Sequence, residues 1–278
     1  MNTVAIFGVG LIGGSFALAL RQAGFSGRIL GVSSPETVRK AIDLGVIDEG
    51  MSAEQATRSA DLIYLAQPIL QIVEILPKLD PWVRPDALVT DAGSTKSTIV
   101  NRAKAIRRCQ FLGGHPMAGR EKRGVEAAEA GLFYGRPYVL TPGTEAELQT
   151  PQAQDFLAWI GKIGAIPVVL NPAQHDQVVA FTSHLPQLAS SGLAALLAGR
   201  DEPKSGVFGP ALLDSTRLAL SSFDIWGDIL VTNRESIRIA LRSYIAQLEE
   251  FSRELETGSM EEHFRRAAKF ASQLRVSP

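Results

Sequence analysis

Residues 3–13 read TVAIFGVGLIG, an apolar run that ends in the glycine motif GVGLIG at positions 8–13. An apolar run followed by glycines and then by a helical pattern predicts a strand, a tight turn and a helix. In this setting Gly8 permits the turn, Gly10 lets a pyrophosphate approach the backbone, and Gly13 lets the helix pack closely on the strand. The start of the helix also offers N–H groups to phosphate oxygens. The stretch therefore predicts a dinucleotide-binding fold.

Strand-like and helix-like segments alternate on the C-terminal side of this motif. We expect strands at 3–7, 28–32, 62–66, 87–90 and 110–113, and helices at 11–23, 35–44, 70–79 and 96–106. Two further strands, at 138–140 and 167–170, are expected at the edge of the sheet, with a helix at 153–163 between them. This alternation predicts right-handed βαβ units. The fold class is an α/β Rossmann fold, a doubly wound and mainly parallel sheet.

The pattern changes at about residue 171, after which helical periodicity dominates. Long apolar-periodic segments cover 173–197, 204–221, 225–255 and 260–274. We expect a dinucleotide-binding Rossmann domain at 1–170 and an all-α domain at 171–278. The apolar faces of these helices exceed what a small bundle buries, which favours a homodimer formed through this domain. Packing of the helices back onto the first domain is the alternative.

Charge and cysteine content narrow the classes of partner. The chain has 278 residues, with 28 basic and 29 acidic side chains and a formal charge of −1, which gives no electrostatic reason to expect nucleic acid or a membrane surface. Its single cysteine, Cys109, excludes an internal disulfide and a multi-cysteine metal site, and no metal is expected. No apolar run reaches the roughly 18 residues of a membrane span. We expect a cytoplasmic protein.

The end of the second predicted strand bears on the choice of cofactor. An acidic residue there would bind the ribose 2′-hydroxyl of NAD, whereas this chain has Ser33. Arg39 and Lys40 follow within reach of a 2′-phosphate, although Glu36 is an alternative ribose contact. The pattern favours NADP over NAD. Candidate cofactor-binding residues are Gly8, Gly10, Leu11, Ile12, Gly13, Ser33, Ser34, Arg39, Ala66, Pro68 and Asp91.

Two loops follow the fourth and fifth predicted strands, where ligands of doubly wound sheets bind. The first reads DAGSTK at 91–96 and the second GGHPMAG at 113–119. His115 is the one histidine of four that is flanked by glycines on such a loop, and a neutral imidazole is suited to accept a proton near pH 7. Ser94 is a candidate N-cap for the helix that follows. We expect Lys96 to organise its loop.

These loops, together with GVGLIGGS at 8–15, LFYGRPYVLTP at 132–142, His175-Asp176 and SHLP at 183–186, resemble the prephenate/arogenate dehydrogenases of tyrosine biosynthesis over nearly the whole chain. The resemblance implies an NAD(P)-dependent oxidative decarboxylation. It yields 4-hydroxyphenylpyruvate from prephenate, or tyrosine from arogenate. It also implies a Rossmann domain at 1–170 followed by a helical substrate and dimerisation domain at 171–278.

The resemblance assigns roles to individual residues. His115 matches the catalytic base, Ser94 a serine that hydrogen-bonds to the same substrate hydroxyl, and Arg217 an arginine that binds the substrate carboxylate. His184 of the SHLP motif is a further candidate for substrate binding, and helix capping or a hydrogen bond between the domains is the alternative. It is nine residues from His175, two and a half helical turns, so the two do not form a joint metal site.

One departure from the family pattern bears on the substrate. Relatives that prefer prephenate often have a second histidine directly after SHLP, where this chain has Gln187. A neutral glutamine favours arogenate, or a broad cyclohexadienyl specificity. Two other functions stay open at this point. A β-hydroxyacid-type dehydrogenase would need a catalytic lysine, which 173–197 lacks. A non-catalytic NADP-binding redox sensor would leave His115, Ser94 and Arg217 unexplained.

Overall fold

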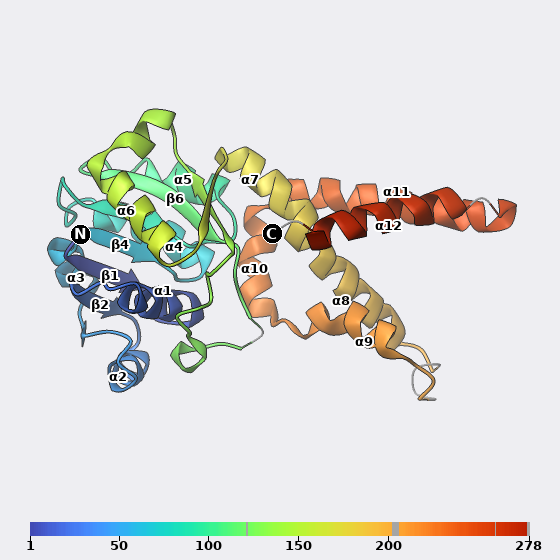
Figure 1. Cartoon of the computed structure of the whole chain (residues 1–278), viewed down its shortest axis with the longest axis horizontal. Helices are drawn as coiled ribbons and strands as arrows, with labels where there is room; N and C mark the ends of the chain where they lie inside the picture. Colours follow the sequence, from blue (N-terminus) through green and yellow to red (C-terminus); the bar gives the residue numbers. More distant parts are fainter. Residues whose placement is uncertain (121, 202–205, 259, 277–278) are drawn as a thin grey trace. The chain divides into compact units, whose positions relative to one another are not determined.

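An eight-stranded sheet forms the centre of the first part of the computed structural model, which describes residues 1–120, 122–201, 206–258 and 260–276 (Figure 1). The strands lie in the order β3-β2-β1-β4-β5-β6-β7-β8. Their bounds are β1 (Thr3–Phe7), β2 (Arg28–Val32), β3 (Glu49–Gly50), β4 (Leu62–Leu65), β5 (Leu88–Asp91), β6 (Gln110–Pro116), β7 (Pro137–Thr141) and β8 (Ile166–Val169).

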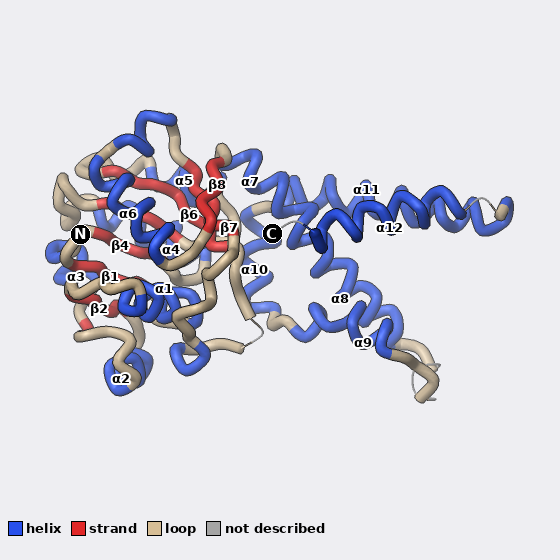
Figure 2. The backbone as a smooth tube through the Cα atoms, in the orientation of Figure 1, coloured by secondary structure: helices blue, strands red, loops and turns tan. Residues whose placement is uncertain are grey.

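The sheet is mainly parallel, as predicted. β7 pairs antiparallel with β6 and parallel with β8, and the other neighbouring pairs are parallel. Figure 2 shows the strands in red among the helices. The prediction that 138–140 lies at the edge was wrong, because β7 lies between β6 and β8 and only β8 is at that edge.

Several of the helices that accompany the sheet start at a residue whose side chain caps them. They are α1 (Leu11–Gln22), α2 (Pro35–Asp43), α3 (Ala53–Ser59), α4 (Ile69–Leu79), α5 (Ser97–Ala103) and α6 (Pro151–Lys162). β3 and α3 were not predicted from the sequence. β3 has only two residues and no apolar run, but α3 has a readable signal. The Ser52 side chain accepts the Gln55 N–H and the Gln55 side chain accepts the Ser52 N–H, which is a capping box.

The glycine motif brings α1 against β1 at close range. Gly8 has φ +88°, a left-handed conformation that favours glycine. A Cβ on Gly13 would lie 2.2 Å from the Gly8 carbonyl oxygen and 2.8 Å from Ile6 Cγ2. One turn further along, the Phe16 ring stacks on Tyr64 of β4 with ring centroids 4.0 Å apart. Helix and sheet therefore share one buried core, as the motif predicted.

The chain divides into two compact units that are not contiguous in sequence. We call Met1–Val179 with Leu220–Asn233 the sheet unit, and Ala180–Ala219 with Arg234–Pro278 the helical unit. The sheet unit includes α7 (Pro172–Val179) and α10 (Phe223–Thr232). The helical unit contains the π-helical segment η3 (Ala180–His184), α8 (Leu185–Ala198), α9 (Pro210–Thr216), most of η5 (Arg217–Leu220), α11 (Arg234–Thr257) and α12 (Glu261–Val276). Within the described residues, no helix is long and apolar enough to span a bilayer.

The predicted long helices are interrupted. The segment 173–197 changes to π-helix at 180–184, and 225–255 is broken at Asn233. Asn233 is buried and its side-chain amide donates to the Asp176 backbone carbonyl at 2.7 Å. That contact is more favourable than continuing the helix with a buried amide unpaired. For 204–221, positions 204 and 205 lie outside the described residues, and the rest contains α9 and η5.

We predict that Gly13→Ala lowers the free energy of unfolding by about 1–3 kcal/mol, because the new methyl group meets backbone that has no room to move. Gly10→Ala is the matched control. Nothing lies within 4 Å of a Cβ at Gly10, so its effect should stay within about 0.5 kcal/mol. Thermal unfolding followed by circular dichroism measures both. Equal melting temperatures for the two variants would contradict the packing argument.

Candidate active site

Two adjoining pockets lie at the carboxyl ends of the parallel strands, around the start of α1. The inner pocket has a volume of about 330 Å³ and the outer pocket about 520 Å³. They share Gly10, Ala66, Gln67, Pro68 and Gly124. β1 and β4 are neighbours in the sheet although β2 and β3 lie between them in sequence, so the pockets lie at the point where the strand order reverses. Doubly wound sheets bind their ligands at this point.

The shared boundary of the two pockets fits the phosphates of a dinucleotide. Gly10 is the N-cap of α1 and no side chain caps that helix, so its first N–H groups face the boundary without a side-chain acceptor. The space next to Gly10 that a Cβ would occupy is open. A helix N-terminus with close backbone access suits an anionic pyrophosphate.

The outer pocket is lined at the end of β2 by Ser33, Ser34 and Thr37. Ser34 also caps α2, since its hydroxyl accepts the Thr37 N–H at 3.3 Å. Neither of the two cations expected to reach a 2′-phosphate, Arg39 and Lys40, lines this pocket. Lys40 pairs with Glu36 at 3.1 Å and with Glu126 at 2.9 Å.

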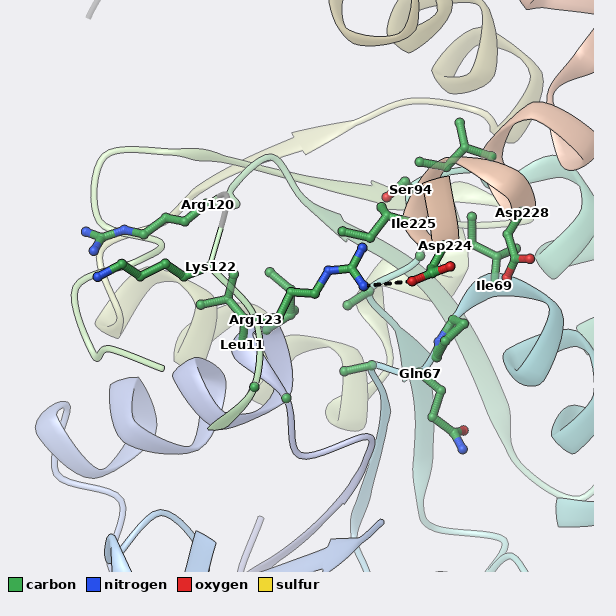
Figure 3. A pocket seen from close by; sticks show the side chains of 18 residues that line it. Leu11, Gln67, Ile69, Ser94, Arg120, Lys122, Arg123, Asp224, Ile225 and Asp228 are labelled. Carbon is green, nitrogen blue, oxygen red and sulfur yellow. Dashed lines mark hydrogen bonds and ion pairs between the residues drawn. The ribbon is translucent and has the colours of Figure 1, made fainter. Parts of the chain in front are cut away.

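The inner pocket contains Ser94, with Leu11, Ile12 and Pro68 among its lining residues. The structure does not support Ser94 as the cap of α5, because the N-cap residue of that helix is Lys96. Residues from α10 complete the wall, and Figure 3 shows Asp224 joined to Arg123 by an ion pair of 3.1 Å.

The charged residues of the inner pocket were not among the predicted site residues. Arg120, Lys122, Arg123, Asp224 and Asp228 line it, and Arg120 pairs with Glu129. In Figure 3 the side chains of Arg120 and Lys122 extend away from the Arg123–Asp224 pair. The run of basic residues directly after GGHPMAG was a readable signal for an anion-binding loop.

A buried ion pair joins the loop that carries Ser94 to the end of β6. The prediction of a loop at His115 was wrong, because β6 continues to Pro116. Lys96 and Asp91 are fully buried and in contact, and the Lys96 ammonium also donates to the Gly114 carbonyl at 2.7 Å. The Asp91 carboxylate accepts the N–H groups of Gly93 at 2.8 Å and Gly114 at 3.1 Å. Burial lowers the pKa of Lys96, and the charge of Asp91 opposes that shift. Lys96 thus organises its loop, as predicted, and the Asp91 carboxylate faces the protein interior rather than a pocket.

His115 lies near the end of β6 and is 9% exposed. Its Nδ1 is 2.8 Å from Nε2 of His175, and the Nδ1 of His175 is 2.9 Å from Oδ1 of Asp176. The Asp176 carboxylate also accepts the backbone N–H groups of Lys96 at 2.7 Å and Ser97 at 2.9 Å. The contact between His115 and His175, which are 60 residues apart, was not predicted from the sequence.

Burial and hydrogen bonding together set the charge states of His175 and Asp176. Burial lowers the pKa of His175, and the hydrogen bond to Asp176 only partly offsets this effect. Burial also opposes ionisation of Asp176, but hydrogen bonds from His175, Ser97 and Lys96 outweigh it and hold the pKa of that carboxyl below its ordinary value. A neutral His175 therefore lies between His115 and an ionised Asp176.

The three predicted substrate residues belong to the helical unit. His184 ends η3 and is buried, and Arg217 begins η5 and is exposed. Gln187 of α8 is 5% exposed, and its Nε2 donates to the Leu218 carbonyl at 2.8 Å and to Ser191 Oγ at 3.1 Å. Gln187 thus ties α8 to the residue that follows Arg217.

The chain has a Rossmann sheet, two pockets whose shared boundary fits phosphates, and a serine in the inner pocket. This combination is typical of nicotinamide-dependent oxidoreductases. The comparisons identify the family within this class. The model of the prephenate dehydrogenase nucleotide-binding domain matches residues 16–165, and that of the prephenate dehydrogenase dimerisation domain matches residues 171–270. The chain belongs to the prephenate dehydrogenase family, and it is a prephenate/cyclohexadienyl dehydrogenase of tyrosine biosynthesis.

Individual relatives agree with this assignment. The chain is 34% identical to prephenate dehydrogenase of Bacillus subtilis over 95% of its own length and 73% of that protein. A structure of the Aquifex aeolicus prephenate dehydrogenase with hydroxyphenyl propionate and NAD⁺ is 33% identical, with a TM-score of 0.88 over 100% of this chain and 99% of that one. Synechocystis arogenate dehydrogenase is 30% identical, with a TM-score of 0.81 over 98% and 99%.

Proposed function

We propose that this enzyme oxidises and decarboxylates arogenate to tyrosine with NADP as the favoured cofactor, and that prephenate and NAD are its secondary substrates. In the substrate, one ring carbon carries a hydroxyl group and a hydrogen, and the opposite carbon carries a carboxylate. The bound nicotinamide supplies the acceptor for the hydride. The protein must then remove the hydroxyl proton and align the ring, since loss of CO₂ makes the ring aromatic.

We assign the proton to His115 and a hydrogen bond at the same hydroxyl to Ser94. The observation that carries this assignment is the Lys96–Asp91 pair, which ties the Ser94 loop to the strand end that holds His115. Ser94 lines the inner pocket next to Leu11 and Ile12 of the glycine motif, so a ring bound there would lie next to the cofactor. A neutral imidazole suits the base.

The choice of arogenate rests on Gln187. Both N–H protons of its amide are engaged, by Ser191 and by the Leu218 carbonyl. The Gln187 carbonyl oxygen is then the group available to a ligand, and a carbonyl accepts from the ammonium of an amino acid but cannot donate to a keto oxygen. We assign the substrate carboxylate to Arg217, whose guanidinium offers a fixed fork of donors, and a further substrate contact to His184.

The choice of NADP rests on the end of β2. Ser33 and Ser34 line the outer pocket, and neither carries a charge that would repel a 2′-phosphate. Arg39 is one turn further along α2 and exposed, and we keep it as the candidate phosphate partner. The remaining cofactor contacts are assigned to the backbone of Gly8, Gly10, Leu11, Ile12 and Gly13, to Ala66 and Pro68, and to the loop that Asp91 holds.

We further propose a homodimer formed through the helical unit. Large apolar side chains there are exposed to an extent that a monomer rarely tolerates, among them Val207 at 84%, Leu255 at 72% and Phe264 at 68%. The matched family model describes a dimerisation domain. Analytical ultracentrifugation should return the mass of two copies, and a single-copy mass at micromolar concentration would contradict the proposal.

The decisive experiment measures initial rates of nicotinamide reduction in four combinations, arogenate or prephenate with NADP or NAD. We expect the highest kcat/KM with arogenate and NADP. A preference for prephenate would reject the reading of Gln187, and a preference for NAD would reject that of Ser33. Ser33→Asp is the matched variant. It should lower kcat/KM for NADP at least about tenfold relative to NAD, because a carboxylate repels the 2′-phosphate.

We expect Arg217→Ala to raise KM for the preferred substrate about tenfold or more, since a hydrogen bond to a charged group contributes roughly 1.5–3 kcal/mol. Arg200→Ala is the control, as an exposed arginine of the same unit with no assigned role. Steady-state kinetics at saturating cofactor measure both. An unchanged KM in Arg217→Ala would remove this residue from the site.

A further inference from the structure

We propose that His175 and Asp176 are positioning residues that hold His115 in the tautomer with its proton on Nδ1, so that Nε2 carries the lone pair that accepts the substrate proton. The proposal rests on the assignment of His115 as the base. It gives a function to a buried pair that the proposed reaction does not otherwise use, and it specifies which nitrogen of His115 reacts.

The direction of the hydrogen bonds follows from Asp176. Its carboxylate is buried, with 3% exposure, and accepts the backbone N–H groups of Lys96 and Ser97. An ionised carboxylate only accepts hydrogen bonds, so the Nδ1 of His175, 2.9 Å away, must donate to it.

This donation determines the rest of the chain of contacts. A neutral histidine with its proton on Nδ1 presents a lone pair at Nε2. The Nε2 of His175 is 2.8 Å from the Nδ1 of His115, so His115 must be the donor in that contact. A neutral His115 that donates from Nδ1 has its lone pair on Nε2. The order is therefore His115 Nδ1–H to His175, then His175 Nδ1–H to Asp176.

The surroundings of His175 preserve this order. Its side chain is fully buried, and both ring nitrogens are engaged, one with each neighbour. α7 is anchored at both ends. The Asn171 side chain accepts the Gln174 N–H at 2.8 Å at its start, and Asn233 donates to the Asp176 carbonyl near its end. Rotation of the His175 ring would therefore leave two buried polar groups without partners.

The reaction requires no proton transfer from His115 to His175 or Asp176. The substrate O–H bond breaks and an N–H bond forms at Nε2 of His115, which makes that ring an imidazolium with both nitrogens protonated. Its Nδ1–H stays bonded to His175. The new positive charge is then stabilised through two hydrogen bonds by the carboxylate of Asp176.

The test is made at His175, because Asp176 also caps α5 and its loss would disturb that helix directly. His175→Phe keeps a buried ring but cannot accept from His115. His175→Gln carries an amide oxygen at about the reach of Nε2 and can accept. We expect His175→Phe to lower kcat about 10- to 100-fold, the range seen when a group that orients a functional histidine is lost, with KM nearly unchanged. His175→Gln should recover most of that loss.

A second readout does not depend on activity. Nitrogen-15 chemical shifts of the imidazoles in the full-length protein distinguish a protonated Nδ1 from a protonated Nε2. His115 should be in the Nδ1–H form in the natural protein and a mixture of both forms in His175→Phe. An Nε2–H form in the natural protein would overturn the proposal, even if His175→Phe fails to fold. So would a His175→Gln variant that folds normally and is as slow as His175→Phe.

One further variant separates this proposal from the proposed function. His115→Asn should lower kcat by about 10²–10⁴. If the His115→Asn variant has a normal kcat, His115 is not the base. The proposed effect of His175 on catalysis is then wrong as well. The nitrogen-15 spectrum of the natural protein would still report whether the hydrogen-bond order is correct.

Discussion

The contact on which the site depends is the buried pair of Lys96 and Asp91. Its ammonium and carboxylate are both inaccessible to water, so their charges would be costly without each other and without the surrounding N–H and carbonyl groups. Loss of one partner of such a pair typically costs about 3–5 kcal/mol. Lys96 also donates its backbone N–H to Asp176. One residue thus connects the ends of β5 and β6 with α7, and Ser94, His115 and His175 take their positions from it.

The sheet could be predicted because its signals are local. Apolar runs marked β1, β2 and β4, and glycines at 8, 10 and 13 marked the turn whose close packing is seen at Gly13. β3 has no such run, and its two residues pair with β2 only because the chain returns to that edge. The helices after residue 171 were predicted too long for a related reason. The break at Asn233 depends on a contact with Asp176, 57 residues away, which periodicity does not reveal.

The site residues also differ in whether local sequence signals were enough to predict them. Ser94 and His115 could be proposed from loops that follow strands, and the glycine motif and Ser33 from their place beside β1 and β2. His175 and Asp176 were visible as a motif, but their role depends on a contact 60 residues away. The basic residues at 120, 122 and 123 stood beside a recognised motif and were readable, whereas Asp224 and Asp228 reach the pocket only because α10 packs with the sheet unit.

The return of α10 to the sheet unit means that the nucleotide-binding half is not a separable piece of sequence. Asp228 on α10 accepts the N–H of Leu70 at the start of α4, and Thr232 contacts Thr95 beside the Ser94 loop. A fragment cut after β8 would retain the sheet and the glycine turn, but it would lose one wall of the inner pocket. It would also lose His175, which contacts His115, and Asp176, which contacts His175. Fusion of this fragment to another protein would therefore transfer the Rossmann sheet without the complete site.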